Sequence, residues 1–422
     1  MGMTKTLFRM RFAAVLLCVM AAVATATGRS VVLSPQVKSL TAVVGADWLS
    51  PPVLTLGSDE VLNVGFDEMS HTFRRFVYTV EHCEYDWTKS EELFESDYLE
   101  GFNNNPIEDY RNSINTVIQY THYSFSIPNE RCRLKMSGNY RLTVYDEDDG
   151  NAPVLTVEFM VAEPLMRVGL EATTNTDVDV NRSHQQMSVR VDYGTATVTN
   201  HDEQLRLVVT QNGREDNARR DVKPNLVNNR GLQWTHNRQL VFDAGNEYHK
   251  YETLDVSHPT MGIERMEWDG TAYNAYTFAS EDRRNYLYDV DANGAFYIRN
   301  SDNVENDYGS EYLYVHYKLR TAEVATGDIV IDGWWTTDAD TANYVMEYDK
   351  DDGSYNVTLL QKQGYYSYQY LLKTSDEQTL IPPSEGNFYQ TENRYQAYIY
   401  YKETGGRTWR LVGYRQLEFG NS

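Results

Sequence analysis

The chain has 422 residues, 33 of them tyrosine, and a formal net charge of −23 at pH 7. This acidic balance argues against nucleic acid and against an anionic membrane surface as partners, because both are bound through clustered Lys and Arg. A chain of this length exceeds a single hydrophobic core, so two to four domains are expected.

The N-terminus predicts an exported protein. Three basic residues precede an apolar run over residues 12–23, and small residues follow it, which is the pattern of a cleaved secretory signal. The run is too short to span a bilayer. A lipid anchor on Cys18 is disfavoured because Leu17 stands where a small residue is needed. We expect residues 1–26 to be the signal peptide, with cleavage near Ala26, and its loss brings the net charge to about −26.

The mature chain has the hydrophobic pattern of β-strands. Segments that alternate with a period of two are separated by turn dipeptides such as Asn212-Gly213 and Asp352-Gly353. The pattern predicts an all-β protein with several immunoglobulin-like β-sandwich domains in tandem. A helix of one turn is expected only within residues 89–99. The clearest predicted strands lie at residues 74–80, 140–144, 205–209, 312–317 and 355–359.

A polar stretch at residues 172–183, after a strand expected at residues 154–161, and a second break around residues 319–326 suggest the domain boundaries. We expect an N-terminal β-sandwich domain over residues 27–165 and a middle β domain over residues 166–322. An immunoglobulin-like C-terminal domain is expected over residues 323–422.

Two cysteines remain after removal of the signal, Cys83 and Cys132. An exported protein permits a disulfide between them. Two buried free thiols are the alternative, and the sequence leaves both open.

The sequence contains no motif of a nucleophile, a phosphate-binding loop or a transition-metal site. The segment Asp289 to Gly294 reproduces half of a calcium-binding EF-hand loop, but Asn300 stands where the closing Glu is required. We interpret the segment as a turn. We therefore expect no enzyme, no cofactor and no metal.

Aromatic residues are the best candidates for a function. Tyrosine recurs at every second position over residues 365–370 and again over residues 395–401, which describes a β-surface that binds rather than transforms. Filling of a sandwich core is the alternative for each ring. The candidate contact residues, for a protein partner or a glycan, are Trp334, Trp335, Tyr365, Tyr366 and Tyr368.

Several motifs occur in the same order as in a known family. They include His82-Cys-Glu-Tyr-Asp-Trp87, Tyr120-Thr-His-Tyr123, Ser137-Gly-Asn-Tyr140 and Thr391-Glu-Asn-Arg-Tyr395. In these and other segments, from about Leu56 to the C-terminus, the chain resembles the type IX secretion system plug protein family. Cys132 has no counterpart in that pattern.

This resemblance implies a periplasmic protein of a Gram-negative bacterium. Family members associate with the periplasmic mouth of the outer-membrane translocon barrel and seal it. The resemblance implies no catalytic role, attachment to the membrane only through the barrel, and no oligomer.

The C-terminal domain also resembles early-set immunoglobulin-like modules of glycan-processing enzymes, through segments such as Ile329 to Trp335 and Gly364 to Tyr368. This implies an alternative function, a periplasmic or surface glycan-binding protein that uses Trp334 and Trp335 as a stacking platform. In either case, residues 362–370 and 391–401 are expected to be paired strands of the last domain, with part of the tyrosine serving its packing.

Overall fold

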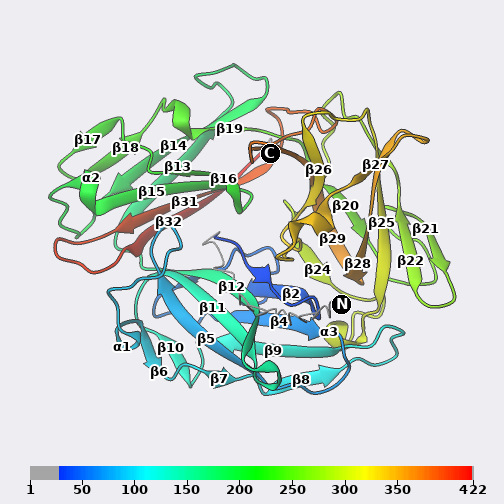
Figure 1. Ribbon diagram of the computed structural model, residues 1–422. Coiled ribbons are helices and arrows are strands. Elements are labelled where there is room, and N and C mark those ends of the chain that lie inside the picture. Colours follow the sequence, from blue (N-terminus) through cyan, green and yellow to red (C-terminus); the bar gives the residue numbers. More distant parts are fainter. Residues whose placement is uncertain (1–27, 421–422) are drawn as a thin grey trace, which may run out of the picture.

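The structure is a computed structural model that describes residues 28–420, and the expected signal peptide lies outside them (Figure 1). Strands make up 49% of the residues, and they form the paired sheets of three β-sandwiches with separate hydrophobic cores. The predicted all-β class and tandem sandwich architecture are confirmed. No helix within residues 28–420 has the length and apolar character needed to cross a membrane.

The first sandwich packs a sheet of order β1-β12-β11-β5-β7, with β3 parallel to β12, against a sheet of order β2-β4-β9-β8. Inward rings such as Phe66, Phe76 and Phe159 fill its core. Its strands are β1 (Val31–Val32), β2 (Val37–Val44), β3 (Val53–Thr55), β4 (Leu62–Glu68), β5 (Phe76–Cys83), β7 (Asn105–Pro106), β8 (Asp109–Asn112), β9 (Thr121–Ile127), β11 (Gly138–Asp146) and β12 (Ala152–Ala162). Beside them lie the ribbon of β6 (Leu99–Gly101) and β10 (Cys132–Leu134), the helical turn α1 (Glu95–Tyr98) and the 3-10 turn η1 (Glu147–Asp149).

The second sandwich is built from two separate parts of the chain. One sheet has the order β13-β14-β18-β17, with β19 also on β14, and the other has the order β16-β15-β31-β32. Its elements are β13 (Arg167–Thr173), β14 (His184–Asp192), α2 (His201–Gln204), β15 (Leu205–Gln211), β16 (Arg214–Arg220), β17 (Leu226–Asn228), β18 (Gly231–Trp234), η2 (Arg238–Leu240), β19 (Val241–Asp243), β31 (Asn393–Tyr401) and β32 (Arg410–Phe419).

The third sandwich lies between these two parts in the sequence. One sheet has the order β21-β22-β25-β28-β27, with β23 also on β25, and the other joins β20, β24, β26 and β30 to β29. Its elements are β20 (His249–Glu252), β21 (Ile263–Trp268), β22 (Tyr273–Thr277), β23 (Ser280–Glu281), β24 (Phe296–Ile298), α3 (Asn306–Gly309), β25 (Tyr312–Arg320), β26 (Gly327–Asp332), η3 (Thr341–Tyr344), β27 (Glu347–Asp349), β28 (Ser354–Lys362), β29 (Gly364–Thr374) and β30 (Thr379–Leu380).

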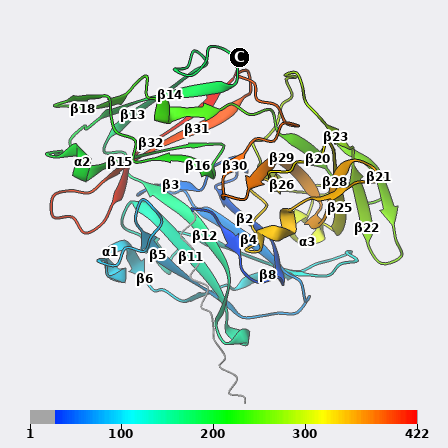
Figure 2. The ribbon, with the colours of Figure 1, turned by 45° about the horizontal axis from the view of Figure 1, so that its top comes forward.

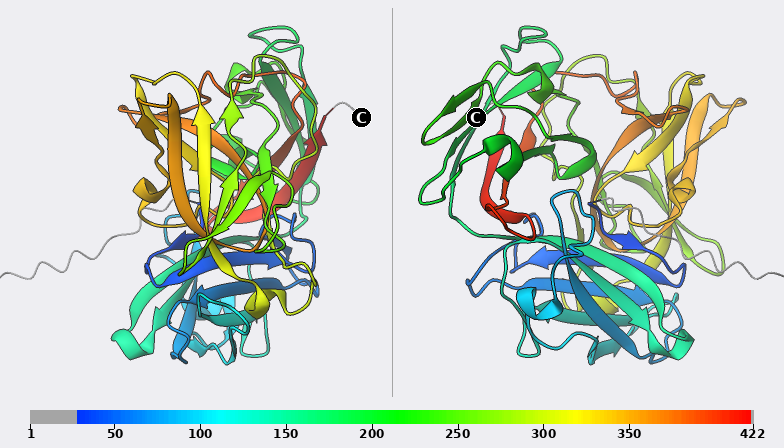
Figure 3. Two further views of the ribbon diagram at one scale, coloured as in Figure 1. Left: turned by 90° about the vertical axis from the view of Figure 1, so that its right-hand side faces the viewer. Right: turned by 60° about the vertical axis from the view of Figure 1, so that its left-hand side comes forward.

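The three sandwiches form a triangle. The second and third stand side by side above the first, and the C-terminal strands β31 and β32 run along the lower face of the second (Figures 1 and 2). Views from the two sides show the same order, with the first sandwich beneath both others (Figure 3). Each sandwich therefore has two neighbours within the molecule.

The five predicted strands are present as β5, β11, β15, β25 and β28. The predicted helical turn is α1, although it begins after Phe94, whose N–H donates to Asp97 Oδ2 at 2.8 Å. The turn at Asn212-Gly213 joins β15 to β16, and both residues have positive φ, which suits the turns that match strand twist.

Strands pair across the domain boundary that was expected between residues 322 and 323. β25 precedes this point and pairs along its whole length with β28, which follows it, so that Val315 lies opposite Leu359. The expected pairing of residues 362–370 with 391–401 is wrong, because β31 pairs with β15 and β32. A two-residue period specifies strands but not their partners. We propose that the third unit spans about residues 246–392 and that the second combines residues 166–245 with 393–420.

Candidate functional site

The tyrosines of β29 face two different environments. Tyr366, Tyr368 and Tyr370 are at most 3% exposed, inside the third sandwich. Tyr366 stacks on Tyr251 with the ring centroids 5.3 Å apart, and its hydroxyl donates to Lys362 O at 2.6 Å. Burial raises the pKa of the Tyr366 phenol. Tyr366 and Tyr368 therefore stabilise the core. The sequence analysis named them as candidate contact residues, but the structure buries both.

Trp334 and Trp335 do not form a stacking platform. Trp335 is 9% exposed and donates from Nε1 to Ser367 O at 2.9 Å, inside the third sandwich. Trp334 is half-buried and donates from Nε1 to Asn212 O at 3.0 Å, across to the second sandwich. Both indoles hold parts of this chain together, so the glycan-binding alternative is not favoured.

Tyr365, on the opposite face of β29, lies where all three sandwiches meet. Its ring centroid is 5.7 Å from that of Trp48, which is also 5.7 Å from the ring of Tyr297. The next residue of the first sandwich, Leu49, accepts a hydrogen bond on its carbonyl from Arg394 Nη1 at 2.6 Å. The loop that carries Trp48 thus contacts both other sandwiches.

The tyrosines of β31 join the second sandwich to the first. Tyr395 and Ile399 point into the second core, whereas Tyr398 and Tyr400 point at the first sandwich. Tyr400 OH donates to Asn139 Oδ1 at 2.7 Å. We call the buried group at this contact the interface cluster: Cys83, Trp87, Met160, Val208, Tyr398, Tyr400, Trp409 and Leu411.

Cys83 and Cys132 are free and buried. Cys132 packs in the first core, whereas Cys83 belongs to the interface cluster on the other face of the sheet. Burial raises the pKa of Cys83 to about 12 and that of Cys132 to about 11. The structure therefore contains the two thiols and not the disulfide, because the side chains lie in different clusters.

A buried charge network joins the first sandwich to the third. Lys362 Nζ lies 2.6 Å from Asp67 Oδ2, and the two side chains are 1% and 0% exposed. Tyr312 OH donates to the same oxygen at 2.7 Å, while His122 Nδ1 lies 2.7 Å from Asp67 Oδ1. Burial by itself would raise the pKa of Asp67, but Lys362 and His122 outweigh it and hold that pKa below its usual value.

Further hydrogen bonds extend this junction. The Glu311 carboxylate accepts from Val117 N at 2.5 Å and from Ile118 N at 3.1 Å. Tyr120 OH donates to Ser310 O at 2.7 Å, and its ring centre lies 4.1 Å from Lys362 Nζ. Buried polar groups with satisfied partners fix one relative orientation of the two sandwiches.

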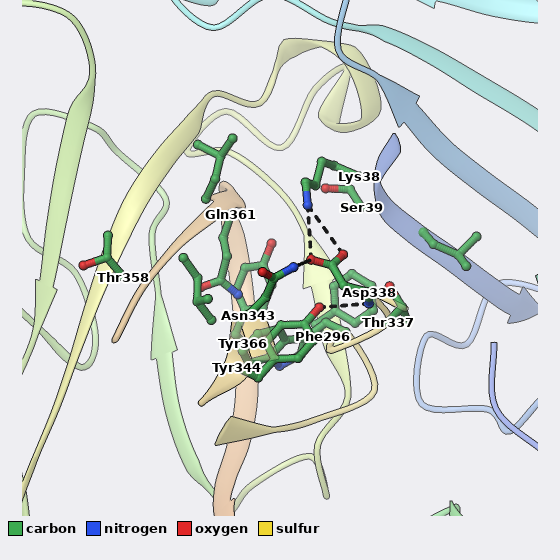
Figure 4. A pocket seen from close by; sticks show the side chains of 14 residues that line it. Lys38, Ser39, Phe296, Thr337, Asp338, Asn343, Tyr344, Thr358, Gln361 and Tyr366 are labelled. Carbon is green, nitrogen blue, oxygen red and sulfur yellow. Dashed lines mark hydrogen bonds and ion pairs between the residues drawn. The ribbon is translucent and has the colours of Figure 1, made fainter. Parts of the chain in front are cut away.

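The junction also contains a half-open pocket of about 270 Å³ (Figure 4). At its rim, Lys38 Nζ lies 3.2 Å from Asp338 Oδ2, and Asn343 Nδ2 donates to the same oxygen at 3.0 Å. Gln361 lines the pocket, and its Nε2 is buried without a partner. The charged side chains at the rim thus pair with one another.

Several aromatic side chains do lie at the surface, and sequence reasoning did not select them as contacts. In the first sandwich Phe94 and Phe102 are 73% and 76% exposed. On the outer face of the third, Tyr276 stacks on His316 at 4.2 Å, with the guanidinium of Arg265 3.5 Å from the Tyr276 ring centre. Alternation in β25 is the signal that marks His316 as outward.

No group of three His, Cys, Asp or Glu side chains within residues 28–420 is placed to hold a metal ion. In the EF-hand-like segment, Asp291 accepts hydrogen bonds from the backbone N–H groups of Asn293, at 2.7 Å, and of Tyr248. Burial raises the pKa of Asp291 to about 7. Its carboxylate oxygens thus serve the loop itself.

Comparison with known proteins identifies relatives of this chain. Residues 37–163 match the family model of the type 9 secretion system plug protein first domain. The crystal structure of a hypothetical protein from Parabacteroides merdae is 34% identical, with a TM-score of 0.89 over 93% of this chain and 99% of that one. No curated protein matches.

Two surface proteins share little with the chain. The N-terminal region of the enterococcal surface protein is 7% identical, covers 93% of this chain and 96% of that chain, and has a TM-score of 0.18. The collagen adhesin of S. aureus is 8% identical, covers 91% and 94%, and has a TM-score of 0.12. The first sandwich matches the family model, and the 34% identical relative shares the whole fold. The chain belongs to the type IX secretion system plug protein family.

Proposed function

We propose that this protein is a plug subunit that binds and seals the periplasmic opening of the outer-membrane translocon barrel of the type IX secretion system. The observation that carries the proposal is the match of residues 37–163 to the first domain of the plug protein family. The protein acts by occupying the opening, which requires neither a catalytic group nor a cofactor.

The proposed location follows from the same family and from the N-terminal sequence. Residues 1–26 direct export and are removed, and the mature chain stays in the periplasm. It is held at the outer membrane by the barrel alone, as a single copy. A charge of about −26 keeps such a protein soluble and away from anionic lipid.

The architecture supports this role physically. A wide, water-filled barrel leaks unless a body of comparable width closes it. The Asp67–Lys362 pair, the Trp48 loop and the interface cluster fix the three sandwiches to one another as one body. A plug held rigid in this way loses little conformational entropy on binding.

We place the contact with the barrel on the first sandwich. It is the part that the family model covers, and it carries the exposed Phe94 and Phe102. Aromatic side chains, Phe among them, are enriched in protein interfaces relative to the rest of the surface. The aromatics first considered as contacts, such as Trp335, are instead committed to internal packing.

Co-purification tests the proposal. A tagged chain, extracted in mild detergent after gentle crosslinking, is expected to bring the outer-membrane barrel with it. Replacing Phe94 and Phe102 by Ser is expected to reduce the recovered barrel at least tenfold without lowering the melting temperature, because both rings are exposed. Phe278→Ser, at a 59% exposed ring of the third sandwich, is the matched control. Recovery of the parent chain only as a free monomer would contradict the plug function.

A further inference from the structure

The half-open pocket at the junction of the first and third sandwiches lies between the edges of two strands. Four consecutive residues of β28, from Thr358 to Gln361, line one side, and residues Lys38 to Leu40 of β2 line the other (Figure 4). Because neighbouring side chains of a strand point to opposite faces of its sheet, a pocket on a sheet face would reach only alternate residues. The pocket therefore runs along the strand edges.

The edge of β28 that lines the pocket has no strand beside it. On its far side β28 pairs with β25 along its whole length. On the pocket side β27 pairs only with residues 354–356. The residue before Glu347 already belongs to the other sheet, where Met346 N donates to Ile329 O at 2.8 Å. Among the described residues, no strand therefore pairs with residues 357–362 on the pocket side.

The hydrogen-bond pattern of the ladder tells which main-chain groups of this edge face the pocket. Gln363 N donates to Glu311 O at 2.8 Å, in register with the β25–β28 pairing, so Gln361 and every second residue before it exchange hydrogen bonds with β25. In an antiparallel pair the residues between them turn their N–H and C=O groups the other way. Thr358 and Leu360 thus present both groups to the pocket, about 6.8 Å apart along the strand.

Gln361 adds an unused donor at the same place. Its side chain is 6% exposed, and its Oε1 accepts hydrogen bonds from Tyr251 OH, at 2.7 Å, and from Tyr317 OH. Its Nε2 is buried and has no partner among the described residues. Buried amide groups are normally hydrogen-bonded, so this donor calls for an acceptor.

We propose that the pocket binds an extended segment of a separate polypeptide, which adds to the edge of β28 as a further strand. An extended main chain offers N–H and C=O groups at the spacing that Thr358 and Leu360 require. The volume of about 270 Å³ lies just below the range of about 300–1,000 Å³ for pockets that hold whole small ligands, and it suits a few residues of chain. This inference does not rest on the plug function.

Charge favours a particular kind of partner. Two copies of a chain with a net charge of −23 repel each other, which disfavours a second copy as the occupant. The segment that lines the pocket with Asn343 and Tyr344 has exposed carboxylates on both sides, at Asp340 and at Glu347. The fitting partner is therefore a segment with an uncharged centre and basic residues beside it.

The test uses the purified protein and a fluorescent synthetic peptide, acetyl-Lys-Thr-Val-Thr-Val-Thr-Lys-amide. Fluorescence anisotropy is expected to show saturable binding with a Kd below about 1 mM. Two further peptides carry methyl groups on alternate main-chain nitrogens, one for each of the two alternating sets. The set that faces β28 is expected to weaken binding at least about tenfold, because its N–H groups are lost, whereas the other set is expected to change binding little.

Two variants of the protein test the same edge. Thr358→Pro removes an N–H that faces the pocket but no bond to β25, so it is expected to fold cooperatively and to bind the peptide at least about tenfold more weakly. Thr358→Val is the matched control. It also loses the hydroxyl, which lies 2.9 Å from His316 Nδ1, but it keeps the N–H and is expected to bind like the parent.

Three results would each overturn the proposal. They are the absence of saturable binding to the parent, equal binding of the unmethylated peptide and both methylated ones, and equal binding by Thr358→Pro and Thr358→Val. A dimer of the parent in sedimentation that only Thr358→Pro dissociates would assign the edge to a second copy, and would also overturn it. No barrel is present in these measurements, so failure of co-purification would refute the plug function alone.

Discussion

At the scale of single residues, the most consequential pair is Asp67 with Lys362. Both are fully buried, and they belong to different sandwiches. Replacing both partners of a buried ion pair by apolar side chains changes the stability of a protein little. Removing one partner, in contrast, leaves an uncompensated buried charge and is strongly destabilising. The contact therefore makes the relative placement of the first and third sandwiches specific.

We expect Lys362→Met to lower the free energy of unfolding by about 3–5 kcal/mol, because Asp67 then stays buried without its cation. The double variant that also carries Asp67→Asn should recover part of that loss. Chemical denaturation of the three proteins measures this. A single variant as stable as the parent would show that water reaches Asp67.

The Asp67 carboxylate also makes the free energy of unfolding depend on pH. Its pKa is lowered in the folded protein, so its contribution is fully present above the unfolded value of about 3.9 and is lost as the pH falls through the lower folded value. The stability difference between the parent and Asp67→Asn is thus expected to be constant from pH 5 to 7 and to shrink below about pH 4. An unchanged difference at pH 2 would contradict this assignment.

At the scale of elements, the order of strands along the chain does not follow the order of sandwiches. β31 and β32 return to the second sandwich after the third is complete, and they form half of one of its sheets. β31 places Tyr395, Ala397 and Ile399 in the second core and Tyr398 and Tyr400 in the interface cluster. It is buried on both faces, as a central strand between two layers is.

Fragments test this arrangement. A fragment of residues 246–392 contains both sheets of the third sandwich and is expected to show a cooperative thermal transition. A fragment of residues 323–422 lacks β25, the partner of β28, and lacks β15, the partner of β31, so it is expected to stay unfolded. Circular dichroism during heating distinguishes the two. A cooperative transition in the shorter fragment would show that residues 323–422 form a domain of their own.

At the scale of the whole molecule, three sandwiches share three junctions of different chemistry. The first and second meet through the apolar interface cluster, the first and third through the Asp67 network, and all three at the Trp48 loop. Apolar contact supplies most of the stabilisation at the first junction, and buried polar pairing supplies orientation at the second. Such a body can act as one rigid plug.

The proposed sealing role predicts a phenotype. Deletion of the gene is expected to make cells more permeable to large antibiotics that normally cross the outer membrane poorly, while export through the translocon persists, because the open barrel is wide and water-filled. Growth inhibition by such an antibiotic measures the change, and a plasmid-borne copy should restore the barrier. Permeability equal to that of the parent strain would speak against sealing.

The class of fold, the clearest strands and the family could all be predicted from the sequence alone. Alternation over segments such as residues 312–317 identifies a strand because side chains of a strand point to opposite faces in turn. Turn dipeptides and ordered motifs depend only on neighbours along the chain. These local signals were therefore readable from the sequence.

Which strands pair and which aromatic side chains are buried could not be predicted and became known from the three-dimensional structure. Tyr366 and Tyr314 both stand within predicted strands, yet the first is 3% exposed and the second 39%. The difference arises because β29 faces a second sheet, whereas the outer face of β25 has solvent beside it. Which strands pair, and which sheet faces are covered by a second sheet, depends on contacts between residues far apart in the chain. No period or spacing in a single sequence encodes these contacts.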